Sequence, residues 1–253
     1  MTSLRWRSWI GSAQLTGRRH DHSVEIQGGL NREIRSYVLR QGRTTPAQKR
    51  ALEELLPKYG ITFSGRLLSQ EEIFRRNAPL VLEIGSGMGE TTAAIARAHP
   101  EADFIAVEVH GPGVGSLLNR IEKERLSNIR VVRHDAVELL ERMVPDGALA
   151  AIHLFFPDPW PKKRHHKRRL VQPPFVLRMK EKLSAGGIVH LATDWPDYAQ
   201  HIEAVFAENA FFEKAQTGLM ERPTTKFEAR GRRLGNPIRD LYFRRRGTAP
   251  AAR

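Results

Sequence analysis

Short apolar runs alternate with amphipathic stretches along most of the chain. The apolar runs that predict strands lie at 80–84, 103–108, 129–133, 149–156, 188–192, 211–215 and 238–243. The amphipathic stretches that predict helices lie at 90–99, 114–125, 137–143, 173–183 and 198–209. Strands and helices that alternate through short connections predict an α/β fold with a doubly wound, mostly parallel seven-stranded sheet. No helix is predicted between the last two strands, so we expect an antiparallel edge there.

The segment before this alternation differs in composition. Residues 1–44 lack sustained periodicity and are rich in Arg, Gly, Ser and Gln, which predicts a partly disordered basic extension. Thr45 is a helix N-cap residue with Pro46 in the first turn, and Pro57 is expected to end that helix. The expected organisation is therefore an extension at 1–44, one domain at 45–246 and a disordered tail at 247–253.

Charge narrows the class of partner. The chain has 253 residues, a net charge of +13 and no cysteine. Such a basic excess favours a polyanionic partner, and the absence of any apolar run near 20 residues disfavours a membrane. A chain without cysteine has no disulfides, no Cys-based zinc site and no thiol nucleophile. No apolar signal region stands at the N-terminus, so we expect a cytoplasmic protein that binds nucleic acid.

A glycine-rich turn, Gly85-Ser-Gly-Met-Gly89, stands between the first predicted strand and its helix. Its G-x-G-x-G spacing differs from that of dinucleotide-binding folds, and no Lys-Ser/Thr follows as in a P-loop. Four successive strands also end near an acid, and carboxyl ends of parallel strands share one edge. The candidate cofactor-binding residues are Glu83, Gly85, Gly87, Glu108, Asp135 and Asp158.

These acids would repel a pyrophosphate and accept a cationic ligand that carries a ribose. S-Adenosylmethionine fits, with Glu83 acting through the turn or on the ammonium side, Glu108 on the ribose and Asp135 near the adenine. Two alternatives stay open. The acids can simply cap strand ends and the helices that follow, and a NAD-dependent oxidoreductase is a different use of a similar fold.

A second motif follows the fourth predicted strand. Three prolines in Pro157-Asp-Pro-Trp-Pro161 give a stiff loop that holds Asp158 and Trp160. Cations and histidines follow at once: Lys162, Lys163, Arg164, His165, His166, Lys167, Arg168 and Arg169. An acid fixed beside a basic strip suggests chemistry on a nucleic acid, although a solvated basic loop explains the charges alone.

Four motifs together resemble one family. They are Leu82–Glu90, Phe156–Lys162, Thr193–Trp195 and Thr225–Glu228, with Ile34–Arg43 as a further match. They resemble the bacterial tRNA (guanine-N7)-methyltransferases, which are class I methyltransferases with a Rossmann-like sheet. The resemblance runs from about residue 33 to residue 245. It implies transfer of a methyl group from S-adenosylmethionine to N7 of a guanine in the variable loop of tRNA, giving 7-methylguanosine.

The resemblance also implies roles for individual residues. Asp158 is the catalytic candidate. The implied substrate-binding residues are Lys162, Asp194, Thr225, Lys226, Phe227 and Glu228. The implied RNA-binding residues are Arg164, His165, His166, Lys167, Arg168 and Arg169. No metal is expected, because the histidines have no spacing typical of metal ligands, and a monomer and a homodimer fit the pattern equally.

Guanine N7 has an exposed lone pair and no proton to lose, so positioning and electrostatics are expected to dominate the reaction. Asp158 is therefore expected to align the base and stabilise charge, with the role of a proton acceptor left open. Two functional alternatives also stay open. Pro157-Asp-Pro159 faintly resembles the loop of enzymes that methylate exocyclic amines, and the fold can serve as a non-catalytic RNA-binding module.

Overall fold

The computed structural model describes residues 36–37, 42–224, 228 and 237–247. All of them belong to one compact unit, Ile34–Arg253. Most of the predicted N-terminal extension and residues 248–253 of the predicted tail therefore lie outside the described residues. Their expected disorder stays a prediction.

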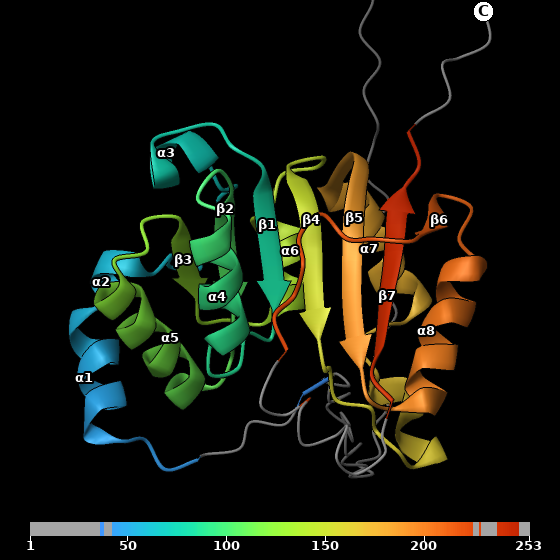
Figure 1. Ribbon diagram of the computed structural model, residues 1–253, viewed down its shortest axis with the longest axis horizontal. Coiled ribbons are helices and arrows are strands. Elements are labelled where there is room, and N and C mark those ends of the chain that lie inside the picture. The colour runs from blue at the N-terminus through green and yellow to red at the C-terminus, as the bar shows by residue number, and fades with distance from the viewer. Residues whose placement is uncertain (1–35, 38–41, 225–227, 229–236, 248–253) are drawn as a thin grey trace, which may run out of the picture. The chain divides into compact units, whose positions relative to one another are not determined.

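A single seven-stranded sheet forms the centre of this unit (Figure 1). Its strands are β1 (Leu80–Ile84), β2 (Asp103–Val107), β3 (Ile129–Val132), β4 (Leu149–Phe155), β5 (Leu183–Thr193), β6 (Phe212–Ala215) and β7 (Arg239–Arg245). They lie in the order β3-β2-β1-β4-β5-β7-β6. Strands β1 to β5 are parallel, while β7 runs antiparallel to both β5 and β6. The predicted fold and its antiparallel edge pairing are confirmed. The edge strand is β6, and β7 lies between β6 and β5.

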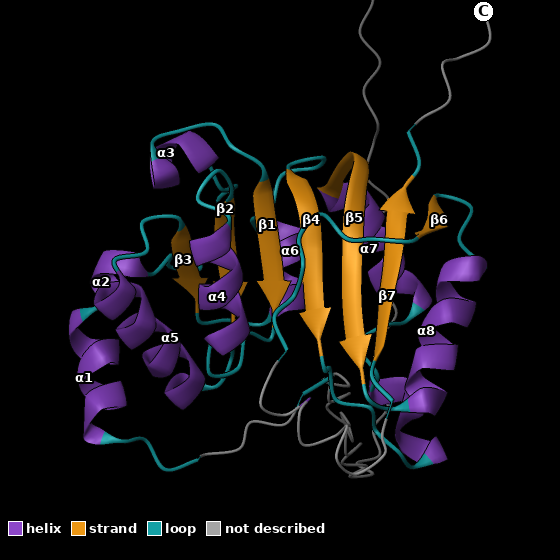
Figure 2. Cartoon of the chain, in the orientation of Figure 1, coloured by secondary structure: helices purple, strands orange, loops and turns teal. Residues whose placement is uncertain are grey.

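Helices cover both faces of the sheet (Figure 2). They are α1 (Pro46–Glu54), α2 (Leu56–Tyr59), α3 (Gln70–Phe74), α4 (Glu90–Ala98), α5 (Gly111–Glu124), α6 (Ala136–Arg142), α7 (Pro173–Lys182), α8 (Pro196–Ala207) and the 3-10 helix η1 (Lys163–Arg168). Successive residues of a strand point to opposite faces of the sheet, so in β1 they pack into two different hydrophobic cores. Val81 packs in a core with α4 and α5, whereas Leu82 and Ile84 pack with α6, α7 and α8.

The first helix begins as predicted and ends earlier. The Thr45 side chain accepts a hydrogen bond from Gln48 N, and the Gln48 side chain accepts one from Thr45 N, which completes a capping box. Helix α1 ends at Glu54, and Pro57 lies in the first turn of α2 rather than at the end of α1. Proline is compatible with a first turn because that position needs no backbone N–H.

Helix α5 begins three residues before its predicted start, and two glycines explain the difference. A Cβ on Gly113 would lie 2.4 Å from the Gly87 carbonyl oxygen, and one on Gly115 would lie 2.6 Å from the Gln48 carbonyl oxygen. Only glycine permits such close approach of backbones. The glycines thus allow α5 to pack between the glycine-rich turn and α1, although they lower its helical signal in the sequence.

One part of the sheet lacks a helical cover. On the face that carries α4 and α5, no helix of the described residues lies over β4, β5 and β7 (Figure 1). Residues 216–224, here called the strap, cross these strands instead. Within the strap, Met220 is buried in the same core as Ala151, and a Cβ added to Gly218 would lie 3.0 Å from the Tyr242 ring. The strap takes the place of a crossover helix there.

Candidate active site

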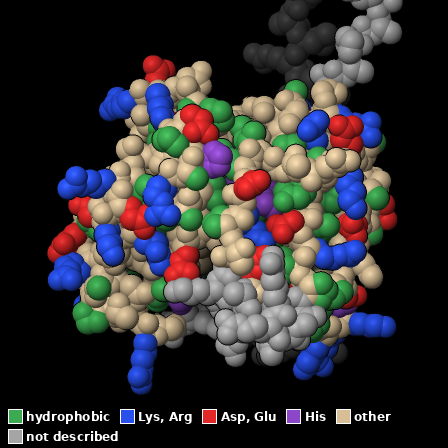
Figure 3. Space-filling view, viewed as in Figure 1, with side chains coloured by type: hydrophobic (Ala, Val, Ile, Leu, Met, Phe, Trp, Pro, Cys, Tyr) green, Lys and Arg blue, Asp and Glu red, His purple; other side chains and the backbone are tan. Residues whose placement is uncertain are grey.

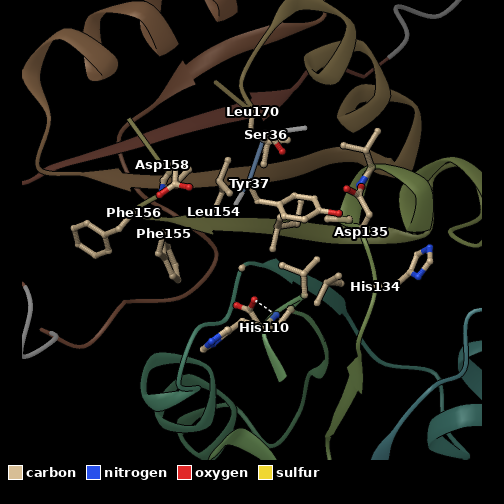
Figure 4. A pocket seen from close by; sticks show the side chains of 18 residues that line it. Ser36, Tyr37, His110, His134, Asp135, Leu154, Phe155, Phe156, Asp158 and Leu170 are labelled. Atoms are coloured by element: carbon tan, nitrogen blue, oxygen red, sulfur yellow. Dashed lines mark hydrogen bonds between the residues drawn. The ribbon is translucent and has the colours of Figure 1, made fainter. Parts of the chain in front are cut away.

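A cavity of about 430 Å³ opens at the carboxyl ends of β1 to β4 (Figure 4). Three of the four predicted strand-end acids line it, namely Glu108, Asp135 and Asp158. Its apolar wall comes from β4 and from the residues after η1, including Leu154 and Leu170. The structure therefore brings most of the predicted cofactor acids together at one opening.

Glu108 holds the backbone around the glycine-rich turn. One of its carboxylate oxygens accepts a hydrogen bond from Gly87 N at 2.8 Å, and the other accepts one from His110 N at 2.8 Å. Gly85 lines the cavity with φ of 75°, and a Cβ added there would meet nothing within 4 Å. The turn thus presents bare backbone to the cavity.

Asp135 caps a helix and also lines the cavity. It is the N-cap of α6, and its Oδ1 accepts hydrogen bonds from Val137 N at 2.7 Å and from Glu138 N at 3.2 Å. Both bonds end on the same oxygen. The second carboxylate oxygen makes no hydrogen bond within the described residues, so an acid that caps a helix also offers an acceptor to the cavity.

Glu83 lies behind the turn rather than in the cavity. Strand alternation puts it on the α4 face, directly opposite His153 of β4. Its side chain is almost fully buried, and burial raises the pKa of Glu83 to about 7. Its Oε2 has no hydrogen-bond partner within the described residues. Of its two expected roles, this place suits an action through the turn.

The loop that carries Asp158 is bent at both ends. Phe156 and Trp160 adopt left-handed backbone conformations with φ of 53° and 46°, which are unfavourable for bulky side chains. Phe156 N donates a hydrogen bond to the Ala192 carbonyl of β5 at 2.7 Å. Between the two bends, Asp158 is exposed and makes no hydrogen bond within the described residues. The loop therefore presents a carboxylate with its acceptor sites available.

Trp160 joins three segments of the chain. Its indole Nε1 donates to the Ser36 carbonyl at 3.1 Å, and the Arg168 guanidinium lies 3.8 Å from a ring centroid. The His165 ring packs edge-on against the same indole. The neighbouring Tyr37 extends into the cavity with its hydroxyl end toward Asp135 (Figure 4). Ser36 and Tyr37 were missed as cavity residues, although they lie in the Ile34–Arg43 motif.

Arg169, one of the predicted RNA-binding residues, is buried. Its side chain is only 1% exposed. Its Nε donates to the Pro159 carbonyl at 2.9 Å, and its Nη2 is hydrogen-bonded to the Asp197 carboxylate. These contacts occupy the guanidinium inside the protein and tie the Asp158 loop to α8, and the RNA-binding role of Arg169 stays a prediction. The exposed cations of the strip are Lys162, Lys163, Arg164 and Lys167.

The predicted substrate-binding residues divide into three groups. Lys162 is exposed at the start of η1. Asp194 is half-buried and follows β5, beside the strand that leads to Asp158. Thr225, Lys226 and Phe227 lie outside the described residues. Glu228 is described and buried, and its carboxylate pairs with Arg222 of the strap at 2.5 Å.

No group of three or more His, Cys, Asp or Glu side chains among the described residues has an arrangement that could hold a metal ion. None of the helices within the described ranges combines the length and the apolar character needed to cross a membrane.

Known methyltransferases share this architecture. Residues 77–241 match a family model described as "Putative methyltransferase". Two solved structures with TM-scores of 0.50 share the fold: the 16S rRNA methyltransferase KamB (17% identity, 72% of this chain and 96% of that one) and the aminoglycoside resistance methyltransferase NpmB1 (16%, 69% and 91%).

Relatives are much closer in sequence. A tRNA (guanine-N(7)-)-methyltransferase of Nitrosomonas europaea is 55% identical over 84% of this chain and 96% of its own length. The protein of the same name from Neisseria meningitidis serogroup B is 51% identical over 87% and 94%, and that from Aromatoleum aromaticum is 53% identical over 86% and 85%. With the family model covering most of the chain and these relatives matched over nearly their whole lengths, the chain belongs to the tRNA (guanine-N(7)-)-methyltransferase family.

Proposed function

We propose that the protein transfers the methyl group of S-adenosylmethionine to N7 of a guanine in the variable loop of tRNA, in the cytoplasm. The observation that carries this proposal is the exposed carboxylate of Asp158, held between two left-handed residues at the mouth of a cavity with two further acids. Relatives more than 50% identical bear the name of this activity. The proposed catalytic domain is 45–246, preceded by a basic extension at 1–44 and followed by a tail at 247–253.

The described residues fit S-adenosylmethionine. The cavity has the volume of a small-molecule site, and its acids complement a sulfonium and an ammonium. Glu108 retains lone pairs for ribose hydroxyls, and the second oxygen of Asp135 suits the adenine amine. The unpartnered Oε2 of Glu83 leaves a polar atom behind the turn. We assign cofactor binding to Glu83, Gly85, Gly87, Glu108, Asp135 and Asp158.

The bound donor would supply a methyl group on a positively charged sulfur. The guanine N7 lone pair forms the new N–C bond as the S–C bond breaks, and the purine becomes cationic without losing a proton. The protein's task is then to align the base and to stabilise the developing positive charge. An exposed Asp158 carboxylate with available acceptor sites suits both tasks.

The tRNA would lie along the basic strip. Exposed Lys163, Arg164 and Lys167 are placed for phosphates, next to His165, His166 and Arg168. On the face shown in Figure 3, Lys and Arg interleave with Asp and Glu. The strip at η1 instead carries cations without an acid between them, which favours it as the place where tRNA binds. We assign the guanine to Asp158 together with Lys162, Asp194, Thr225, Lys226, Phe227 and Glu228.

Labelled S-adenosylmethionine, unmodified bulk tRNA and nucleoside analysis test the proposal directly. The expected product is 7-methylguanosine, at a rate that falls sharply in Asp158→Asn. A methylated exocyclic amine as the only product would replace the proposed reaction with the alternative one. No incorporation by a folded protein that binds S-adenosylmethionine and tRNA would contradict the proposal.

A further inference from the structure

An ionic cluster joins the strap to β5 and β7, outside the cavity lining. Its Arg222 and Glu228 side chains are buried, whereas Asp240 is exposed. The guanidinium of Arg222, whose side chain is 4% exposed, is at its centre. Its Nη1 contacts Glu228 Oε2 at 2.5 Å, and its Nε and Nη2 contact the two carboxylate oxygens of Asp240 at 3.1 Å each. Asp240 in turn pairs with His190 Nε2 at 2.8 Å. One cation is therefore shared by two carboxylates from different parts of the chain.

The pairing between Arg222 and its carboxylates favours the ionised state, although Arg222 and Glu228 are buried. Burial alone would raise the pKa of Asp240, but hydrogen bonds from His190 and Arg222 outweigh it and bring that pKa to about 2. Burial would likewise lower the pKa of Arg222, but its bonds to Asp240 and Glu228 raise it. Each charged group in such a cluster depends on its partners, because an unpaired buried charge is strongly unfavourable.

The same guanidinium also contacts the start of the Asp158 loop. It lies 5.6 Å from the Phe155 ring centroid and 5.4 Å from that of Phe156. Phe156 is one of the two left-handed residues that bend the loop. A planar guanidinium can bind two carboxylates and pack on aromatic rings at once, which a lysine ammonium cannot reproduce.

We propose that Arg222 is a positioning residue for methyl transfer, which fixes Glu228 relative to the loop that carries Asp158. The inference rests on the proposed function, in which both of these carboxylates serve the guanine. Arg222 itself does not line the cavity. It sets the spacing between two groups that have to act on one ring, and displacement of a reacting group by about 1 Å can cost about 100-fold in rate.

The test compares Arg222→Met, Arg222→Lys and Arg222→Ala with the wild type on tRNA methylation, S-adenosylmethionine binding and thermal unfolding. For Arg222→Met we expect kcat to fall about 100-fold, with S-adenosylmethionine affinity changed by less than about twofold. Arg222→Lys keeps the charge and should restore only a small part of the rate. Millimolar guanidinium, but not ammonium, should raise the rate of Arg222→Ala.

Arg178 of α7 provides the matched control. It also pairs with two carboxylates, Glu141 at 3.0 Å and Glu181 at 2.9 Å, but it lies away from the cavity and is 35% exposed. Arg178→Met should keep the wild-type kcat. If Arg222→Met does not fold, Arg222→Lys and the guanidinium rescue of Arg222→Ala carry the same test.

Two results would overturn the inference. One is a variant of Arg222 that melts earlier but keeps the wild-type kcat per folded molecule. The other is a loss of rate that follows a parallel loss of S-adenosylmethionine binding. Failure of the proposed function itself looks different, since the wild-type protein would then form no 7-methylguanosine.

Discussion

The two sides of the cavity are held in place in different ways. On the β1–β3 side, Glu108 and Asp135 bond to backbone N–H groups of the turn and of the helix that begins there. On the β4–β5 side, Asp158 depends on side chains from distant segments. Trp160 bonds to Ser36, Arg169 to Asp197, and Arg222 packs on Phe156.

Under the proposed function, this difference separates cofactor binding from methyl transfer. Carboxylates tied to local backbone form with the strands and helices themselves, so the proposed cofactor side is preorganised by the fold. The Asp158 loop contains two unfavourable backbone conformations that persist only where surrounding contacts enforce them. We therefore expect substitutions on the first side to change ligand affinity and stability, and substitutions on the second to change kcat.

Asp158→Ala should give the largest effect on turnover. We expect kcat to fall by about 100- to 1,000-fold, because an electrostatic group at the reacting base is lost. The melting temperature should stay near that of the wild type, since Asp158 is exposed and bonds to no described residue. Single-turnover methylation and thermal unfolding measure the two quantities. Glu71→Gln, at an exposed acid of α3, is the control.

A pH profile sharpens that result. If Asp158 aligns the base, the rate should be nearly flat from pH 6 to pH 9, and Asp158→Asn should stay slow throughout. A rate that falls with acid in the wild type alone would instead make Asp158 a proton acceptor.

Glu108→Ala should show the opposite division of effects. It removes the acceptor of two backbone N–H groups, so we expect unfolding to become easier by about 2–4 kcal/mol. The affinity for S-adenosylmethionine should fall by about 10- to 100-fold through loss of a charge-assisted hydrogen bond. Urea unfolding and calorimetric titration measure these changes. Equal affinity in the variant and the wild type would exclude Glu108 from the donor site.

The pH dependence of stability tests the burial of Glu83 behind the glycine-rich turn. Its pKa is about 7 in the folded protein against 4.5 when unperturbed, so the folded state retains a proton that the unfolded chain loses. Stability should therefore decline as pH rises from about 4.5 to 7, by roughly 3 kcal/mol in the absence of ligand. Glu83→Gln should abolish this decline in urea unfolding. A decline of the same size in the variant would assign it to other groups.

The basic strip should give the smallest effects. Lys163→Met or Lys167→Met should each reduce the salt dependence of tRNA affinity, the slope of log K against log salt, by about 1 unit or less. Arg169→Met should leave that slope unchanged and lower kcat, because its guanidinium holds Pro159 inside the protein. A reduced slope for Arg169→Met would return it to the RNA-binding surface.

The sequence predicts the two sides unequally well, for a physical reason. Strand ends, the glycine-rich turn and the acids beyond them follow from local periodicity, and the structure has all of these elements. The strap has no hydrophobic periodicity of its own. Within residues 216–224, Met220 packs into the core and Gly218 leaves little room for a side chain beside Tyr242, and two isolated positions make no repeating pattern. Its importance appears only once β7 lies between β5 and β6.

Individual side chains show the same limit. In a run of cations, nothing in the sequence distinguishes buried Arg169 from exposed Lys167, since the difference comes from Asp197 at the start of α8. Strand β5 begins at Leu183, five residues before its predicted start, because Leu183 pairs with Leu149 of β4. Gly186 and Gly187 lie in the irregular stretch between that pair and the Ala151–Ile188 pair, and Gly186 has φ of 78°.

The place of β7 in the sheet has a consequence for biosynthesis. Chains fold from the N-terminus as they are made, yet β7 is the last strand among the described residues and inserts between two earlier ones. Until Arg239–Arg245 leave the ribosome, β5 has an open hydrogen-bonding edge and Arg222 lacks its Asp240 partner. A nascent or prematurely terminated chain would therefore combine a completed β1–β3 side of the cavity with an incomplete β4–β5 side. It would also have an unpaired strand edge that invites aggregation.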